Sequence, residues 1–96
     1  MKQVTIFCSS DLAEHVRNTL IETGVDGFME VPHAVGTRPD AALRRGRYPN
    51  FDAEMIIAAT EDEQAEQIVV SLTRFIGCQE PKPCLRVLVA PLDVAF

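Results

Sequence analysis

The chain has 96 residues, 47% of them hydrophobic, and a formal net charge of −5. This length fits a single domain, residues 1–96, and no apolar run approaches the roughly 18 residues that a membrane-spanning helix needs. The acidic balance disfavours nucleic acid and anionic membranes as partners. Because the N-terminus is too short and too β-like for a signal peptide, we expect a soluble cytoplasmic protein.

The N-terminal third predicts a strand followed by an amphipathic helix. Apolar and polar residues alternate over residues 3–9, the pattern of a strand with one buried face. Leu12, Val16 and Leu20 then recur every four residues, which predicts a helix whose apolar stripe packs on a sheet. Gly24 stands where the C-terminal cap of this helix belongs.

The middle of the chain predicts two strands separated by a long loop. The first runs from residue 27 or 28 to residue 35, and Pro32 within it favours a sheet edge or a bulge, because proline cannot donate to a ladder. The periodic pattern fails over residues 36–51, a loop of about 15 residues, and loops of that length are more often functional than decorative. Residues 52–59 predict the next strand, with the odd-numbered positions as its core face and the even-numbered face becoming buried toward the C-terminal end.

The C-terminal third predicts a second helix and a last strand. Thr60 to Glu63 forms a capping box, and apolar residues follow at helical spacing from residue 65 to 76. Residues 85–90 predict the fourth strand. The order βαββαβ with right-handed crossovers predicts an α+β, ferredoxin-like two-layer sandwich with an antiparallel sheet and a long loop between its second and third strands.

Both helices of such a sandwich cover the same face of the sheet. The opposite face then holds Phe7, Phe28 or Met29, Ile56 and Leu88, and some of these side chains are too apolar to leave in water. We therefore expect the chain to associate with further copies of itself through this face, and the alternative is a large exposed apolar patch.

The long loop carries a cluster of arginines on an otherwise acidic chain. A guanidinium presents a planar fork that suits phosphate, carboxylate or bicarbonate, so the cluster predicts an anion site or a docking loop. The alternative is that these arginines are solvated or pair with acidic side chains. The residues assigned to the ligand site are Gly36, Thr37, Arg38, Arg44, Arg45 and Arg47, with Lys82 and Arg86 as a second cationic pair.

The cysteines and histidines leave several interpretations open. Cys78 and Cys84 flank five residues that include two prolines, and they could be inert reduced thiols, a redox pair or metal ligands. His33 could ligate a metal or titrate near neutral pH, and His15 is placed on the solvent side of the first helix. Cys8 is expected to be a buried strand residue.

The sequence contains no recognised enzyme motif. It lacks a nucleophile elbow, a phosphate-binding Walker loop, an HExxH zinc motif and a dinucleotide glycine fingerprint. We therefore expect a binding or regulatory protein and not an enzyme.

The chain resembles the PII-like superfamily of signalling proteins, which includes the CutA proteins. The resemblance rests on the element order, on residues 11–28 as a helix, glycine and following strand, and on Arg44 to Tyr48 in a long loop at the position of the PII T-loop. It implies a homotrimer whose sheets face inward, with small ligands in clefts between subunits and a T-loop that docks a partner such as a membrane transporter or an enzyme. Some PII-like proteins also carry a redox-active cysteine pair, to which Cys78 and Cys84 are loosely similar.

The resemblance also implies ligand classes, namely an adenine nucleotide, bicarbonate or another small anion, or a divalent metal. Residues 77–84 contain one glycine and two prolines, whereas PII nucleotide sites use a glycine-rich segment there, so the chain resembles a divergent and short member. The alternatives are a CutA-like metal-responsive protein and a plain protein-interaction domain.

Overall fold

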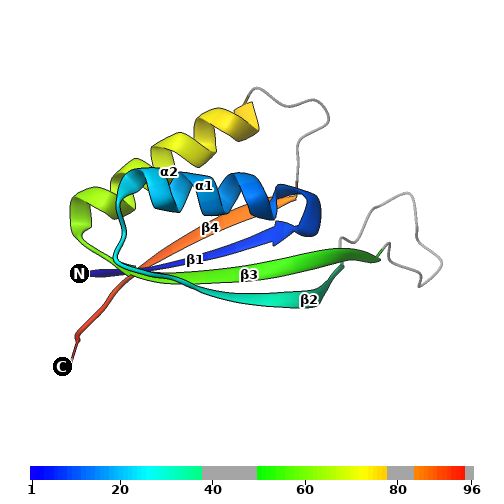
Figure 1. The fold of residues 1–96 in the computed structure, drawn as a ribbon, viewed down its shortest axis with the longest axis horizontal. Helices are drawn as coiled ribbons and strands as arrows, with labels where there is room; N and C mark the ends of the chain where they lie inside the picture. Colours follow the sequence, from blue (N-terminus) through cyan, green and yellow to red (C-terminus); the bar gives the residue numbers. More distant parts are fainter. Residues whose placement is uncertain (38–49, 78–83, 95–96) are drawn as a thin grey trace.

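The computed structural model describes residues 1–37, 50–77 and 84–94, which form one sheet and two helices (Figure 1). The elements in chain order are β1 (Lys2–Ser9), the short 3-10 helix η1 (Ser10–Leu12), α1 (Ala13–Thr23), β2 (Met29–Thr37), β3 (Asn50–Thr60), α2 (Asp62–Gly77) and β4 (Leu85–Pro91). No helix in the described ranges is long and apolar enough to cross a membrane.

The four strands form a sheet in the order β2-β3-β1-β4, in which every neighbouring pair is antiparallel. Both helices lie on the same face of this sheet (Figure 1). This arrangement confirms the predicted α+β, ferredoxin-like sandwich. Each crossover helix spans one intervening strand, so β1 comes to lie between β3 and β4 although it opens the chain.

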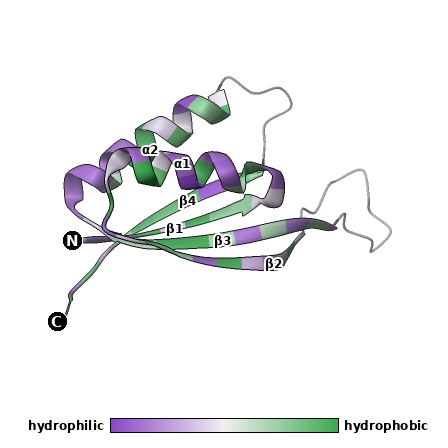
Figure 2. Ribbon diagram, viewed as in Figure 1, coloured by the Kyte–Doolittle hydropathy of each residue, from purple (hydrophilic) through white to green (hydrophobic). Residues whose placement is uncertain are grey.

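The core lies between the helices and the sheet. Val16 and Leu20 of α1 and Ile68 and Leu72 of α2 are fully buried there, at the spacing expected for helices with one apolar stripe. Apolar residues also run along β1, β4 and the middle of β3 (Figure 2). The buried face of β1 is the alternating set that the sequence indicates, and its members are Val4, Ile6 and Cys8.

The choice of the odd-numbered positions of β3 as its core face is wrong, whereas the predicted burial of its even-numbered face toward the C-terminal end is confirmed. Ile56 is 0% exposed and packs under the helices, whereas Met55 and Ile57 lie on the opposite face and are half-buried. The register explains the difference, because Ile56 lies directly opposite Ile6 of β1, whose side chain belongs to the core. Residues directly opposite in an antiparallel pair point to the same face, so the even-numbered positions of β3 join the core.

The face without helices, called the open face below, carries exposed apolar side chains as predicted. Phe7, Met29 and Leu88 are 44%, 71% and 47% exposed. Phe28 instead packs against the core, and Ile56 is not on this face. The open face therefore presents a large apolar surface, a feature that monomeric proteins seldom leave in water.

The cap predicted at the end of α1 is present, and the cap predicted at the start of α2 lies one residue later than expected. Gly24 adopts a left-handed conformation with φ 84°, and its N–H bonds to the Ile21 carbonyl at 3.1 Å, so the predicted cap is confirmed. At the start of α2 the Glu61 N–H donates to Oε1 of Gln64 at 3.0 Å. This bond caps the helix one residue later than the box predicted at Thr60, whose hydroxyl donates to the Lys2 carbonyl at 3.5 Å.

The strand β2 lies at the sheet edge and contains a bulge between Val31 and Ala34, which confirms the prediction for Pro32. Two predicted boundaries are wrong, because β2 extends to Thr37 and β3 begins at Asn50, so both reach into the segment expected to be loop. The added residues pair in register, Gly36 with Phe51 and Thr37 with Asn50. The rest of the predicted loop lies outside the described residues.

Candidate functional site

The predicted ligand-binding residues fall into two groups. Gly36 and Thr37 at the end of β2 and Arg86 on β4 lie in the described part of the chain, as do Cys84 and His33. The remaining predicted residues lie outside the described ranges, and they are Arg38, Arg44, Arg45, Arg47, Cys78 and Lys82. Only the first group can be placed in a site.

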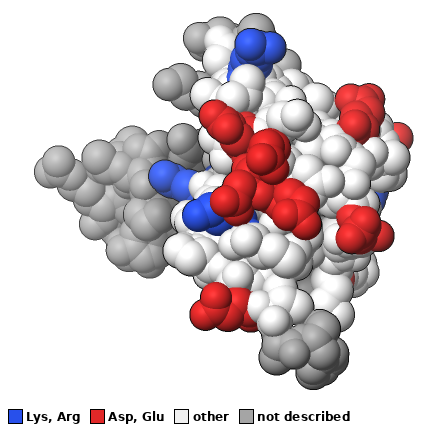
Figure 3. Space-filling view, turned by 90° about the vertical axis from the view of Figure 1, so that its left-hand side faces the viewer, with Lys and Arg blue, Asp and Glu red and all other residues white. Residues whose placement is uncertain are grey.

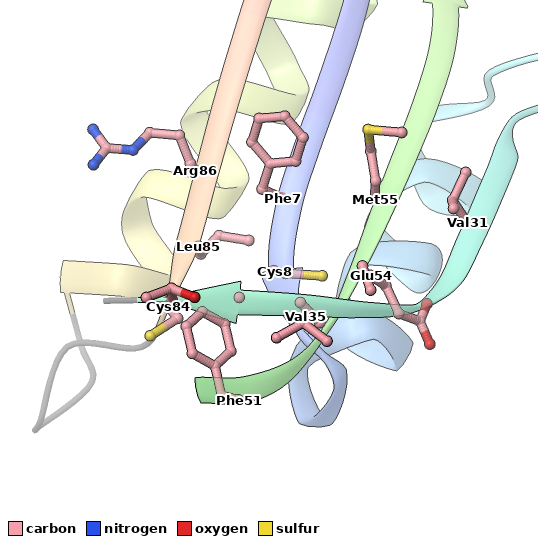
Figure 4. A pocket seen from close by; sticks show the side chains of 14 residues that line it. Phe7, Cys8, Val31, Val35, Phe51, Glu54, Met55, Cys84, Leu85 and Arg86 are labelled. Atoms are coloured by element: carbon pink, nitrogen blue, oxygen red, sulfur yellow. The ribbon is translucent and has the colours of Figure 1, made fainter. Parts of the chain in front are cut away.

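A pocket of about 530 Å³ lies at the end of the sheet where β1 ends and β4 begins. Phe7 of β1 and Met55 of β3 contribute from the open face, and the last part of β2 crosses in front of β1 and β4 in the close view (Figure 4). Phe51, Val31 and Val35 add further apolar walls. A concave, mostly apolar site with few polar groups is typical of a small-ligand pocket.

The structure brings Gly36, Thr37, Arg86 and Cys84 around this one pocket, although they are far apart in sequence. Arg86 lies opposite Phe7 in the β1–β4 ladder, which places it on the open face and not in the core. Of the described residues that line the pocket, Arg86 is the one cation. A single guanidinium on an apolar wall would select an anionic group in a bound ligand.

Close contacts shape the β2–β3 side of the pocket. The ring of Phe51 lies directly against the backbone of Gly36, so that a Cβ at Gly36 would overlap the ring. Next to this pair, the hydroxyl of Thr37 donates to Oδ1 of Asn50 at 3.1 Å. The two ends of the strands that flank residues 38–49 are thus held together by an aromatic contact and by a side-chain hydrogen bond.

A charged network connects α1 to the strands beneath the pocket. The Arg17 guanidinium lies 3.1 Å from a carboxylate oxygen of Glu30 on β2 and 3.6 Å from one of Glu54 on β3. Glu54 borders the pocket, and its Oε2 is buried with no hydrogen bond from the described residues. Arg17 therefore offsets the one acidic charge among the described lining residues, which matters for a site that takes an anion.

The sequence analysis did not identify Arg17 and Glu54. The available signal was the position of Glu54, two residues before Ile56 and on the same side of β3. An acid on the core side of a strand needs a charged partner nearby. The incorrect choice of core face for β3 hid this requirement.

Cys8 is 2% exposed, as predicted, and it is one of the residues that line the pocket. Burial raises the pKa of the Cys8 thiol from its ordinary 9.0 to about 11, and the nearby Glu54 carboxylate adds to the increase. At neutral pH the thiol is therefore protonated, which makes it a poor nucleophile and a poor metal ligand.

Neither histidine lines the pocket. His33 is exposed at the bulge of β2. His15 was predicted on the solvent side, which is wrong, because its ring stacks on Phe75 of α2 with centroids 3.9 Å apart. Within the ranges that the structure describes, no three His, Cys, Asp or Glu side chains are grouped to hold a metal ion.

Acidic side chains gather at the other end of the molecule, where α2 begins (Figure 3). Asp62 and Glu63 occupy the first turn of α2, where they interact favourably with the positive end of the helix dipole. This helix start follows Thr60, while the pocket lies near Phe51 at the opposite end of β3. The acidic end is therefore separated from the pocket by the length of β3.

No family model and no curated protein matches the chain, but solved structures match it. CPII from Thiomonas intermedia K12 bound to ADP and bicarbonate has a TM-score of 0.70 at 21% identity, over 93% of this chain and 82% of that chain. CPII bound to ADP, AMP and bicarbonate, a nitrogen regulatory PII-like protein, has a TM-score of 0.69 at 18% identity, over 99% and 94%. CutA from Xylella fastidiosa has a TM-score of 0.68 at 15% identity, over 99% and 86%.

The fold therefore places this chain among the ferredoxin-like α+β sandwiches. Within this class it has the fold of the PII-like and CutA proteins, and the resemblance predicted from the sequence is confirmed at the level of the fold. The low identities make it a divergent representative of that fold.

Proposed function

We propose that this chain is a PII-like regulatory protein that binds a small anion or an adenine nucleotide in the open-face pocket. The observation that carries the proposal is the meeting of Gly36, Thr37 and Arg86 around one apolar pocket. The CPII structures that share the fold contain ADP, AMP and bicarbonate, which gives the ligand class to test first.

The lining of the pocket suits an anion attached to an apolar or planar body. The Arg86 guanidinium can donate two parallel hydrogen bonds to a phosphate, carboxylate or bicarbonate group. Phe7 and Phe51 supply aromatic surface of the kind on which a planar ring stacks. Arg17 reduces the repulsion that the Glu54 carboxylate would otherwise exert on an anion.

We further propose that three copies of the chain associate through their open faces and complete the pocket as a cleft between subunits. The exposed side chains of Phe7, Met29, Val31 and Leu88 supply the apolar surface that such an interface buries. A homotrimer of this kind would cover the face that no helix covers.

In this proposal the arginine-rich residues 38–47 dock a partner protein, such as a membrane transporter or an enzyme, in the cytoplasm. Ligand binding next to Thr37 would favour one arrangement of that segment over another, which requires a difference in affinity between the two arrangements. We assign the chain no catalytic role of its own.

The test is a calorimetric titration of the reduced protein with ADP, AMP and bicarbonate, alone and in pairs. Arg86→Gln should weaken the binding of these ligands by about tenfold or more, since it removes the charge and the guanidinium fork while keeping a polar side chain. Arg74→Gln, on the exposed surface of α2, is the matched control and should bind as the unmodified chain does.

If none of the three ligands binds, the proposal that the pocket takes an adenine nucleotide or bicarbonate is wrong. Zinc and copper belong in the same series, because a CutA-like response to metal is the alternative predicted from His33 and the cysteines. Binding of a metal alone would favour that alternative, and the His33→Ala variant would then locate the ligand.

A further inference from the structure

The bulge in β2 is an irregular feature next to the pocket. Val31 lies opposite Met55 and Ala34 lies opposite Ala53, so two residues, Pro32 and His33, face the single Glu54. His33 has φ 61°, which makes it the one non-glycine residue with positive φ in the described part of the chain. This left-handed conformation is uncommon for residues with a side chain, and Asn, Asp and His adopt it more often than the others.

Every residue of β2 that follows the bulge borders the pocket. These residues are Ala34, Val35, Gly36 and Thr37. A bulge bends its strand and increases the local twist. In the close view the part of β2 that carries Val35 runs across the ends of β1 and β4, near Cys84 and Leu85 (Figure 4). The bulge therefore lies at the point where β2 turns toward the pocket.

The position of β2 at the sheet edge allows the bulge to bend the strand. The strand is at the edge of the sheet, so only β3 fixes its course among the described strands. Pro32 has no N–H to donate to that ladder, and its ring fixes its own φ. A regular strand with one residue opposite Glu54 would follow β3 without the extra turn.

We propose that Pro32 and His33 form a positioning element that holds Val35 and Gly36 across the ends of β1 and β4 and so sets the width of the ligand pocket. The proposal rests on the proposed function for its ligand, but its structural part stands without it. His33 is a positioning residue, because it acts through the strand that follows it and does not line the pocket.

Deletion of His33 tests the proposed role of the bulge, because the register of β2 and β3 shows which residue pairs the deletion would change. Without this residue Pro32 alone faces Glu54, and the downstream pairs from Ala34–Ala53 to Thr37–Asn50 keep their partners. The deletion thus removes the bulge and leaves the pairing of the pocket residues of β2 with β3 unchanged. Substitutions at His33 give a second series, because Gly and Asn tolerate positive φ whereas the β-branched Val does not.

The first measurement is the affinity for ADP in the presence of bicarbonate, by calorimetry. The His33→Gly and His33→Asn variants should bind as the unmodified chain does, while His33→Val and the deletion should bind about tenfold more weakly. Loss of binding in His33→Gly as well as in His33→Val would show that the imidazole itself matters, which would overturn a role in positioning. Unchanged affinity in the deletion variant would also overturn it.

The second measurement needs no ligand and is the crystal structure of the deletion variant beside that of the unmodified chain. The part of β2 that carries Val35 and Gly36 should no longer cross the ends of β1 and β4 in the variant, and retention of that arrangement would overturn the proposal. If the unmodified chain binds neither ADP nor bicarbonate, the proposed function fails while this comparison still decides the role of the bulge. If the deletion prevents folding, the structures of His33→Val and His33→Gly make the same comparison.

Discussion

The imidazole of His15 stacks on the ring of Phe75, with centroids 3.9 Å apart and an angle of 26° between the planes. His15 belongs to α1 and Phe75 to α2, so the stack joins the two helices near the end of α2. The Nε2 atom of His15 is buried and has no hydrogen-bond partner among the described residues. A contact made by ring faces, and not by a hydrogen bond, holds this side chain between the helices.

We expect a coupling free energy of about 1 kcal/mol between these two rings, the usual size for a stacked pair. Urea unfolding of His15→Ala, Phe75→Ala and the double variant measures it as the departure from additivity. The pair His15→Ala and Val70→Ala is the control, because Val70 is 42% exposed on α2 and not part of the stack. Additive losses for His15 and Phe75 would show that the stack contributes nothing specific.

Replacement of Arg17 by methionine should lower the free energy of unfolding by on the order of 2 kcal/mol at neutral pH. The variant leaves the buried Oε2 of Glu54 without its cation, and an uncompensated polar group is costly. Addition of Glu54→Gln to the same chain should recover part of the loss. Arg74→Met, at an exposed position of α2, should change stability by less than about 0.5 kcal/mol.

Replacement of Gly36 by alanine should destabilise the chain by about 1–3 kcal/mol, the range for forced overpacking. The added Cβ would meet the ring of Phe51, so the ring or the strand must move. The cost should fall when Phe51→Ala is introduced first, which chemical unfolding can measure. Gly27→Ala serves as the control, because no atom lies within 4 Å of its added Cβ.

The buried thiol of Cys8 should make the protein less stable at alkaline pH. Its pKa is raised from 9.0 to about 11 in the folded chain by burial and by Glu54, so the unfolded chain loses this proton first. The contribution is complete below pH 9 and is lost as the pH rises from 9 to about 11. Unfolding curves at pH 8, 10 and 11 should show a smaller alkaline loss for Cys8→Ala, and equal losses would contradict the shift.

If the open face is the interface of a trimer, Leu88→Glu should release monomers. A carboxylate on that face would lose its water on association, at a cost that apolar contacts cannot offset. Light scattering after size exclusion measures the mass directly. Ile21→Glu is the control, because Ile21 is 64% exposed on α1, on the side of the helices. A monomeric unmodified chain would contradict the proposed assembly.

The helices and the edge strand could be predicted because their signals are local. The apolar stripe of α2, the glycine that caps α1 and the proline of β2 each depend on neighbours within a few residues. The choice of core face for β3 was wrong because both faces of that strand are apolar in its second half. Its correct face depends on Ile6, about fifty residues earlier in the chain.

The candidate site likewise combines residues that the sequence indicated with contacts that only the fold creates. The sequence named Gly36, Thr37 and Arg86 as ligand residues, but nothing in their spacing indicates that they share a pocket. Sequence analysis also missed Arg17 and Glu54, since their pairing across α1 and β3 exists only once the helix lies on the sheet.

The amino-acid sequence by itself determined the order of the elements and the ferredoxin-like class, because periodicity, caps and turns are encoded in neighbouring residues. The tertiary structure alone decided which face of β3 is buried and which residues surround the pocket. These features depend on strand register and on the bulge at His33, and register joins residues that the chain keeps far apart.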